Sequence, residues 1–424
     1  MSRQIRLAIV GCGGMGHRHL YGLAELRRIG WEGFDLVGAC DPVRENAASL
    51  ANQAARDFGT HPAVVGDLDE LAALGVEAVS VTTTPRYHHT LVVETLNRGW
   101  HTMVEKPMGV TVRACNIIWR AAEKNNAILS VAENYRRDPI NRLAKALLDA
   151  GVIGEPRFLL HHSVGGRDQM IITAWRHQKN QGGILLDVGV HFTDMMEYLL
   201  GEIDTVYGKT RLHERTRKNP AAKGGSPKNN PSRVYEQWQK QMPAEFEATA
   251  EDAAYATLTF KSGVVGQYVE DHAGYGQGIW TRRIHGSRGS MTLPQDRSGG
   301  TIILNIEGED VCDDERMLNL VPDFHLDTIT AGLFGGDRLW RYQFPFSETD
   351  RKNIAIEYGN FAASILGEGD VEVDAEQGTR SVAVSYAMLE SNEIGLPVSV
   401  DEVISEKVKY YQQEINNSLG ILSV

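Results

Sequence analysis

The chain has 424 residues, a formal net charge of −12 at neutral pH and a hydrophobic content of 42%. This length and composition are typical of a globular protein with two domains of ordinary size. The negative charge argues against a nucleic-acid-binding protein, for which a basic footprint is expected. The sequence has no run of about 18 apolar residues, so we expect no membrane span and no membrane partner.

The N-terminus and the cysteines predict the cellular compartment. The chain enters an apolar strand at Ile5, which leaves no room for a signal peptide. Its four cysteines, Cys12, Cys40, Cys115 and Cys312, have no metal-binding spacing such as C-x-x-C. Free thiols are typical of a reducing compartment. We therefore expect a cytoplasmic protein without a metal site.

Residues 5–16, IRLAIVGCGGMG, combine an apolar strand with a glycine-rich turn. The turn contains Gly11, Gly13, Gly14, Met15 and Gly16, with the first, second and fourth glycines in a G-x-G-x-x-G spacing. The first glycine of such a turn permits the bend, the second leaves room for a phosphate, and the third lets the helix pack close to the strand. Backbone N–H groups and the helix N-terminus then face a pyrophosphate. This turn predicts a dinucleotide-binding site.

An acidic residue ends the second predicted strand. A helix at 15–29 and a strand at 34–40 lead to Asp41. A carboxylate at this position accepts hydrogen bonds from the adenosine ribose and repels a 2′-phosphate, so it favours NAD over NADP. Two alternatives stay open. Arg44 is close enough to accept a 2′-phosphate, and Asp41 could instead only cap the following helix.

Strands and helices alternate through the first third of the chain. Further strands are predicted at 63–65, 78–81, 101–104 and 128–132, and helices at 44–58, 68–74, 90–98 and 111–125. This alternation predicts an α/β Rossmann domain with a doubly wound parallel sheet at residues 1–135. Ligands of such sheets lie outside the carboxyl ends of the strands. The candidate cofactor-binding residues there are Thr83, Thr84, Pro85, His89, Glu105, Lys106 and Asn134.

The pattern changes in the remainder, residues 136–424, where strands follow one another. Strand-like segments occur at 157–163, 205–211, 253–260, 264–269, 281–285 and 301–305, with helices at 188–200, 353–366 and 376–392. Runs of strands with few helices predict an α+β domain built on a large, mainly antiparallel sheet. We expect this second domain to bind the substrate.

Residues 213–245 interrupt the strand pattern. They are rich in Pro, Gly, Asn and Lys and carry the aromatic residues Tyr235 and Trp238. An irregular insert of this length is usually functional or disordered. We expect it to close over the substrate cleft or to contact a neighbouring subunit. A solvated surface loop is the alternative.

Lys106 is the first candidate catalytic residue. It follows a predicted strand at the sheet edge where ligand is expected. Its ammonium group could orient a substrate hydroxyl or stabilise a developing alkoxide. An ordinary surface lysine is the alternative.

The segment 182–191, GGILLDVGVH, supplies the next candidates. Asp187, His191, Asp194 and Tyr198 follow at spacings of four, three and four, which places them on one polar helix face. A histidine is a natural general base because its pKa lies near neutrality, and Asp187 one turn earlier would orient it. Alternatively, Asp187 caps the helix and His191 is a hydrogen-bonded buried histidine.

Two clusters combine polar and aromatic side chains near the predicted cleft. They are Asn134-Tyr135-Arg136 and Trp175-Arg176-His177. Aromatic faces with hydrogen-bonding neighbours suit a sugar or a nicotinamide amide. We expect substrate contacts from Tyr135, Arg136, Trp175 and Arg176, and cofactor contacts from the last two as well. Scattered surface residues are the alternative.

Several motifs occur in a fixed order: GCGGMG, TTTPRYHH, EKP, ENYRRDP, WR and GGILLDVGVH. The ordered set resembles the Gfo/Idh/MocA family of oxidoreductases over nearly the whole chain. The resemblance implies an N-terminal Rossmann domain and a C-terminal domain whose open sheet mediates dimers or tetramers. It also implies that Lys106 and His191 act on the substrate hydroxyl beside the nicotinamide ring, with Asp187 in the same site. The insert and residues 310–352 depart from the family.

The residues and the resemblance together predict an NAD-dependent oxidoreductase that oxidises a hydroxyl of a sugar, cyclitol or glycoside. His191 would remove the hydroxyl proton, while Lys106 and Asp187 hold the alkoxide and the imidazole in place. The cofactor would carry the redox chemistry.

Two other functions stay open. An NAD-dependent glycosidase oxidises the sugar transiently, eliminates the aglycone, adds water and reduces the sugar again. It would need a second base, for which Tyr135, Tyr275 and His325 are candidates. A non-catalytic NAD-binding regulator would be expected to lack one of the three catalytic residues, all of which are present.

Overall fold

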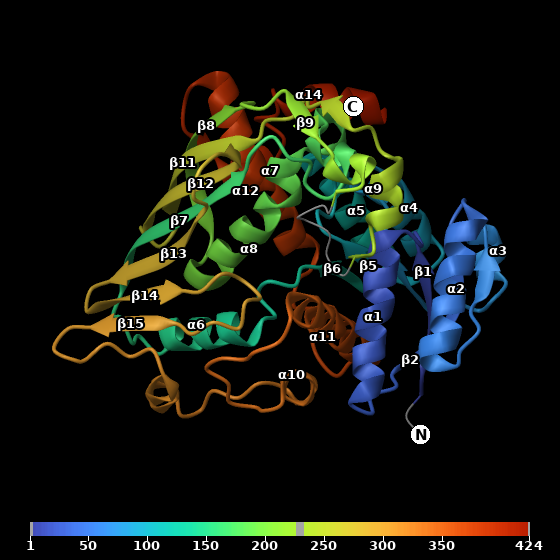
Figure 1. Ribbon diagram of the computed structural model, residues 1–424, viewed down its shortest axis with the longest axis horizontal. Helices are drawn as coiled ribbons and strands as arrows, with labels where there is room; N and C mark the ends of the chain where they lie inside the picture. Colours follow the sequence, from blue (N-terminus) through green and yellow to red (C-terminus); the bar gives the residue numbers. More distant parts are fainter. Residues whose placement is uncertain (1–2, 226–232, 423–424) are drawn as a thin grey trace.

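The computed structural model describes residues 3–225 and 233–422, which form two large β-sheets with helices packed against them (Figure 1). Residues 226–232 of the insert predicted at 213–245 lie outside the described residues.

The first sheet is parallel and lies in the N-terminal part of the chain. Its six strands are β1 (Ile5–Val10), β2 (Phe34–Cys40), β3 (Ala63–Val65), β4 (Ala78–Val81), β5 (His101–Glu105) and β6 (Leu129–Ala132). They lie in the order β3-β2-β1-β4-β5-β6. The chain winds outward in both directions from β1 and β4, which confirms the doubly wound Rossmann sheet. Its ligand crevice is expected where β1 and β4 end.

The helices between these strands follow the predicted alternation. They are α1 (Gly14–Arg28), α2 (Arg44–Phe58), α3 (Leu68–Ala72), α4 (His88–Asn97) and α5 (Val112–Asn125), with a 3₁₀ turn at Pro85–Tyr87. The starts of two of them are set by side chains. Asp67 accepts hydrogen bonds from backbone N–H groups of α3, and Thr111 accepts one from Ala114 in α5.

The second sheet has eight strands in the order β15-β14-β13-β7-β12-β11-β8-β16. Their bounds are β7 (Pro156–Gly166), β8 (Ile203–Arg211), β11 (Ala253–Phe260), β12 (Val265–Gly274), β13 (Ile279–Gly286), β14 (Gly289–Leu293), β15 (Ile303–Ile306) and β16 (Val398–Ser399). β7 and β12 run parallel, and the other neighbouring strands are antiparallel. The predicted large, mainly antiparallel sheet is confirmed.

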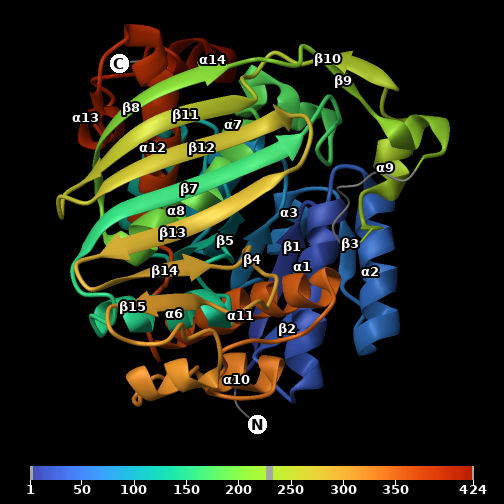
Figure 2. The same cartoon turned by 60° about the vertical axis from the view of Figure 1, so that its left-hand side comes forward.

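Helices cover one face of this sheet. α7 (Ile184–Asp187), α8 (Gly189–Leu200) and α12 (Ala375–Ile394) lie behind the strands in Figure 2, and no described helix lies in front of them. Burial along β7 alternates accordingly: Leu159 and His161 are buried, whereas Phe158 and Leu160 are half-buried. The predicted helix at 188–200 is present as α8, and Val188 separates it from the short helix α7, which ends at Asp187.

A long helix from the C-terminal part returns to the first sheet. α11 (Phe346–Leu366) packs along α1, and the rings of Tyr358 and Phe361 lie 5.7 and 6.2 Å from the ring of Phe34 at the start of β2. Helix α11 begins before the predicted residue 353. The helix layer on the first sheet thus draws on residues from both predicted domains.

Outside the insert, four further helices of the described residues were not predicted. They are α6 (Pro139–Asp149), α10 (Thr328–Phe334), α13 (Val400–Ile404) and α14 (Gln412–Leu419). Helix α6 begins with Asp138 as its cap and Pro139 in its first turn, a start signal that could have been recognised. The other three have at most eight residues, so their hydrophobic periodicity is weak.

The described part of the insert is ordered around a small hairpin. β9 (Thr216–Lys218) and β10 (Glu245–Glu247) pair antiparallel, and α9 (Glu236–Gln241) lies beside the start of α1 in both views (Figures 1 and 2). None of the described helices is long and apolar enough to cross a membrane. The described residues also contain no cluster of three or more histidine, cysteine or acidic side chains able to hold a metal ion.

Candidate active site

The glycine turn connects β1 to α1 at the centre of the first sheet. Gly11 has a φ angle of +96°, which disfavours other residues, and a Cβ there would lie 2.7 Å from the Thr83 side chain. A Cβ on Gly16 would lie 2.4 Å from the carbonyl oxygen of Gly11. At Gly13 nothing lies within 4 Å of that position, and no side chain caps the start of α1. This open, uncapped helix start fits the pyrophosphate of a dinucleotide.

Asp41 lies beside this turn and is buried. One of its carboxylate oxygens accepts a hydrogen bond from the backbone N–H of Cys12 at 2.8 Å, and the other accepts one from Val43 at 2.9 Å. Asp41 therefore ties the glycine turn to the start of α2 and also lines the cleft. Capping is therefore part of its role, and Oδ2, whose donor is Cys12, keeps a further lone pair for a ribose hydroxyl.

Most of the predicted site residues converge on one cleft with a volume of about 390 Å³. It runs from the glycine turn past the ends of β4, β5 and β6 to the start of α8. The predicted residues that line it are Gly11, Gly13, Gly14, Met15, Asp41, Thr83, Thr84, Pro85, Glu105, Lys106, Asn134, Tyr135, Trp175, Arg176, Asp187 and His191.

Four predicted residues lie outside the lining of this cleft. Gly16 packs against Gly11, as described. Arg44 donates a hydrogen bond to Glu70 at 2.5 Å, away from the cleft. His89 is buried in the first turn of α4. Arg136 was expected to bind substrate, but its guanidinium forms an ion pair with Asp194.

The pairing of Arg136 with Asp194 is bidentate and buried. Nε and Nη2 of Arg136 donate to the two carboxylate oxygens at 2.9 and 2.5 Å, and the guanidinium lies over the Tyr198 ring at 5.1 Å. The predicted polar face of α8 thus exists, but its C-terminal half binds this arginine instead of lining the cleft.

Asp187 holds two cations at the centre of the site. Lys106 Nζ donates to the backbone carbonyl of Asp187 at 2.6 Å and to Oδ1 at 3.1 Å, and Arg176 Nε donates to Oδ2 at 2.7 Å. Burial alone would raise the pKa of Asp187, but the charges of Arg176 and Lys106 lower it well below its usual value. Asp187 was expected to orient His191. Its carboxylate instead accepts from Lys106 and Arg176.

His191 has a different acidic partner. Its Nδ1 lies 2.7 and 2.8 Å from the two carboxylate oxygens of Glu133, which follows β6. Burial raises the pKa of Glu133 to about 7. Burial also lowers the pKa of His191 well below its usual value, and the charge of Lys106 lowers it further. With Nδ1 directed at Glu133, Nε2 is the ring nitrogen able to accept a proton.

The imidazole of His191 is fixed by stacking as well. The Tyr135 ring lies parallel to it at 4.0 Å, and the Arg297 guanidinium lies over the Tyr135 ring at 4.5 Å. Arg297 also donates to the Tyr135 hydroxyl at 3.1 Å and to Asp350 at 2.9 Å, and Arg18 donates to the same Asp350. Four segments distant in sequence thus support one ring.

Several of these residues were not predicted from the sequence. Glu133 stands in the quoted ENYRRDP motif, at the same strand end as Asn134 and Tyr135, so its position was a usable signal. Arg18, Arg297 and Asp350 carried no local signal. Arg18 lies on α1, Arg297 in the loop after β14, and Asp350 in the first turns of α11.

The insert contributes Tyr235 to the same cleft. A Cβ on Gly14 would lie 2.6 Å from the Tyr235 ring, so this ring rests directly on the glycine turn. The ring is buried, and its hydroxyl lies 3.5 Å from the Met15 sulfur. Tyr235, from the described part of the insert, therefore lies over the glycine-turn end of the cleft.

Of the three candidates for a second base, Tyr135 lines the cleft. Tyr275 is 61% exposed at the turn between β12 and β13, and His325 is exposed and pairs with Asp337 at 2.8 Å. Burial raises the pKa of Tyr135, which disfavours its phenolate.

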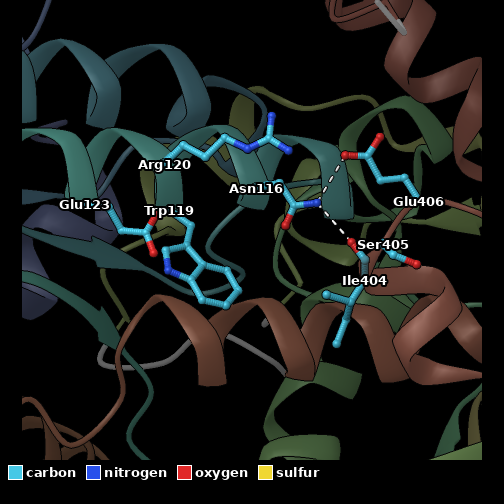
Figure 3. Close-up of a pocket in the computed structure, with 7 residues that line it drawn as sticks. All are labelled: Asn116, Trp119, Arg120, Glu123, Ile404, Ser405 and Glu406. Carbon is cyan, nitrogen blue, oxygen red and sulfur yellow. Dashed lines mark hydrogen bonds between the residues drawn. The ribbon is translucent and has the colours of Figure 1, made fainter.

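A hollow of about 320 Å³ lies elsewhere, between α5 and the end of α13 (Figure 3). Asn116 donates to the Ile404 carbonyl at 3.0 Å and to Glu406 at 3.1 Å, and Glu406 also accepts from Arg113. Asn116 and Glu406 are thus hydrogen-bonded to each other, and none of the predicted site residues lines the hollow.

Comparison with known protein families matches both parts of the chain. Residues 5–133 match the Gfo/Idh/MocA model described as an oxidoreductase family with an NAD-binding Rossmann fold. Residues 145–400 match the model of the C-terminal α/β domain of the same family.

Characterised relatives have related activities. The chain is 27% identical to the NAD(+)-dependent scyllo-inositol 2-dehydrogenase of Bacillus subtilis, over 95% of this chain and 98% of the relative. It is 26% identical to the levoglucosan dehydrogenase of Pseudarthrobacter phenanthrenivorans, over 70% of this chain and 75% of the relative.

Solved structures share the fold. A levoglucosan dehydrogenase in complex with NADH superposes with a TM-score of 0.72 at 20% identity, covering 94% of this chain and 99% of that one. The two family matches together span most of the chain, in the order that the motifs predicted. The protein therefore belongs to the Gfo/Idh/MocA family of NAD-binding oxidoreductases.

Proposed function

We propose that the protein is an NAD-dependent dehydrogenase that oxidises a hydroxyl group of a sugar, cyclitol or glycoside. The observation that carries this proposal is the meeting of Lys106 and the Glu133–His191 pair in the cleft that begins at the glycine turn. A cation for the alkoxide and a base for its proton thus lie in the same cleft as a dinucleotide site.

The substrate oxygen is expected between Lys106 and His191. His191 Nε2 removes the hydroxyl proton, and the Glu133 carboxylate at Nδ1 stabilises the imidazolium that forms. The Lys106 ammonium stabilises the negative charge on the substrate oxygen. Asp187 holds that ammonium in place and balances the charge of Arg176. NAD, when bound, supplies the oxidising power by accepting the hydride from the same carbon.

The cofactor site would be formed by the glycine turn, Asp41 and the polar strand ends. Asp41 supports a preference for NAD over NADP, because a 2′-phosphate would meet its carboxylate. Arg44 gives no support to NADP, since Glu70 binds its guanidinium. We infer that residues 1–135 bind the cofactor and that residues 136–424 bind the substrate and mediate assembly.

The substrate class is supported by relatives and by the lining of the cleft. The relatives named above oxidise an inositol and an anhydrosugar according to their names. The cleft offers Asn134, Trp175 and Arg176, a combination of hydrogen-bonding and aromatic groups that suits a polyhydroxylated ring. The redox-neutral glycosidase has weaker support, because burial disfavours the Tyr135 phenolate that a second base would require.

We also propose a homo-oligomeric assembly and a cytoplasmic location. The face of the large sheet that no described helix covers carries exposed apolar side chains, including Tyr207, Tyr255, Val265 and Ile279. An apolar sheet face of this kind favours a homo-oligomer formed through the sheet. The four cysteines are buried free thiols, which supports the cytoplasm as the compartment.

A substrate screen tests the proposal. Sugars, cyclitols and aryl glycosides are incubated with enzyme and NAD, and NADH absorbance and aglycone release are followed together. We expect NADH to accumulate in proportion to oxidised product. Aglycone release without NADH would establish the glycosidase instead, and no change with any compound would favour the regulator.

A further inference from the structure

The catalytic cleft continues into a second, larger cavity, which we call the outer cavity. Its volume is about 1260 Å³, compared with about 390 Å³ for the cleft. Tyr135, Ile172, Val188 and Arg297 line both spaces. Because Tyr135 lines both spaces and stacks on His191, the outer cavity lies next to the cleft on the Tyr135 side of the catalytic imidazole. Drug-sized ligands occupy pockets of roughly 300–1,000 Å³, so the outer cavity has room for a further ring.

Two walls of the outer cavity come from different parts of the fold. The sheet side is formed where β7 ends and β13 begins, with Ser163 paired directly opposite Trp280. Gly165 lies two residues further along β7 and therefore points to the same, helix-covered side of the sheet. The opposite side is formed by Phe344 and Phe346, at and just before the start of α11.

Part of this wall is bare. A Cβ placed on Gly165 would have no atom within 4 Å, and its φ angle is not in the left-handed region. Neither the backbone conformation nor a close neighbour therefore requires glycine at position 165. The missing side chain leaves open space in the outer cavity. Phe346 is 47% exposed, although an aromatic ring of this size is normally buried.

Two charged groups of the outer cavity, Asp296 and Arg297, have partners of opposite charge. Both carboxylate oxygens of Asp296 accept from Arg282, at 2.6 and 2.9 Å, and Arg297 donates to Asp350. The Arg351 guanidinium lies over the Tyr21 ring at 4.3 Å. Aromatic rings with hydroxyl neighbours such as Ser163 suit a ring that has an apolar face and polar edges.

We propose that the outer cavity binds the second ring of a glycoside, the group joined through the glycosidic oxygen to the sugar that is oxidised. This inference rests on the proposed dehydrogenase function and specifies its substrate class. A single sugar ring would fill the cleft beside His191 and leave the outer cavity without a ligand. The second ring is either another sugar or an aromatic aglycone, since both have an apolar face.

Matched ligands test the proposal. For glucose, galactose, mannose and xylose, three compounds are compared: the methyl glycoside, the p-nitrophenyl glycoside and a disaccharide carrying that sugar at its non-reducing end. Affinities for the enzyme saturated with NADH are measured by calorimetry, and kcat/KM is measured with NAD. In at least one series we expect a two-ring ligand to bind about tenfold or more tightly than the methyl glycoside. The disaccharide and the p-nitrophenyl arms distinguish the two kinds of second ring.

Variants locate the advantage in the outer cavity. Gly165→Val fills the bare wall, and Phe346→Ala removes an aromatic surface. Each should reduce the ratio of two-ring to methyl-glycoside affinity by about tenfold or more. Two matched controls should keep the ratio: Gly369→Val, at another glycine with nothing within 4 Å of its Cβ position, and Leu366→Ala, an exposed residue at the other end of α11.

The outcomes separate this inference from the proposed function. If two-ring ligands bind more tightly and Gly165→Val abolishes this advantage, the outer-cavity assignment is supported. This holds even if no compound yields NADH, because the lack of NADH would overturn only the proposed dehydrogenase function. Equal affinity of two-ring and methyl ligands in every series would overturn the outer-cavity assignment. So would an equal loss for both ligand types in Gly165→Val, or a change in oligomeric state with the ratio unchanged.

Discussion

Nδ1 of His191 lies 2.7 Å from Oε1 of Glu133 and 2.8 Å from Oε2, in a buried contact between residues 58 positions apart. This geometry fixes the imidazole tautomer, because a carboxylate accepts the Nδ1 proton and leaves Nε2 for the substrate. Glu133 is therefore a positioning residue for the proposed general base.

The pH dependence of catalysis tests this pairing. Burial raises the pKa of Glu133 to about 7 and lowers the pKa of His191. We expect kcat/KM to rise with pH up to about 7 in the wild type, because an additional proton on the pair blocks proton transfer. Glu133→Gln should move this limb to more acidic pH and reduce kcat by roughly 10²–10⁴-fold. Glu94→Gln, at an exposed acid on α4, is the control. Identical pH profiles for wild type and Glu133→Gln would rule out the role of Glu133.

The same residue predicts a trend in stability. The folded-state pKa of Glu133 is raised from 4.5 to about 7, so the protonated form stabilises the fold. That contribution is complete below pH 4.5 and is lost as pH rises towards 7. The melting temperature of Glu133→Gln, compared with wild type, should therefore increase over this interval. A constant difference in melting temperature would contradict the raised pKa.

Lys106 and His191 should act as one unit. His191→Ala and Lys106→Ala are each expected to slow turnover by roughly 10²–10⁴-fold, through loss of the base and of alkoxide stabilisation. The double variant should lose less than the product of the two effects. NAD affinity, measured by calorimetry, should change little. A His191→Ala enzyme with full turnover and a much lower melting temperature would make His191 a structural histidine.

Asp41 should determine the choice of cofactor. Asp41→Asn removes the charge and keeps one acceptor oxygen for the N–H group of either Cys12 or Val43. The preference for NAD over NADP should fall by roughly tenfold or more, because repulsion of the 2′-phosphate is lost. Asp35→Asn, on the same strand, is the control. Titrations that show equal affinity for both cofactors in the wild type would refute this role.

Tyr235 should couple the insert to cofactor binding. Gly14→Ala places a methyl group 2.6 Å from the Tyr235 ring, so the ring or the turn must move, and we expect NAD affinity to fall by about tenfold. Adding Tyr235→Ala should restore part of this affinity, whereas adding Trp238→Ala should not. Failure of Tyr235→Ala to restore any affinity would show that the insert does not constrain the turn.

The uncovered sheet face should mediate assembly. Leu160 lies near its centre, between Gln267 of β12 and Arg283 of β13. Leu160→Lys should lower the molar mass measured by light scattering, because a charge in an apolar interface is costly to desolvate. Val64→Lys, at an exposed apolar residue of β3, is the control. An unchanged mass for Leu160→Lys would move the interface to another surface.

Local patterns in the sequence were sufficient to predict the two sheets and the glycine turn. The spacing of Gly11, Gly13 and Gly16 and the alternation of strands and helices predicted the parallel sheet, and runs of strands predicted the second sheet. Lys106 and His191 were recognisable because each follows a strong local signal, a strand end or a polar helix face.

Which side chains contact one another depends on the tertiary structure. In the folded protein, Glu133 pairs with His191, Asp187 binds Lys106 and Arg176, and Arg136 binds Asp194 outside the cleft. These contacts join strand ends to helices from the other half of the chain. Their partners depend on how the two halves of the chain pack together, which the periodicity of a single segment does not contain.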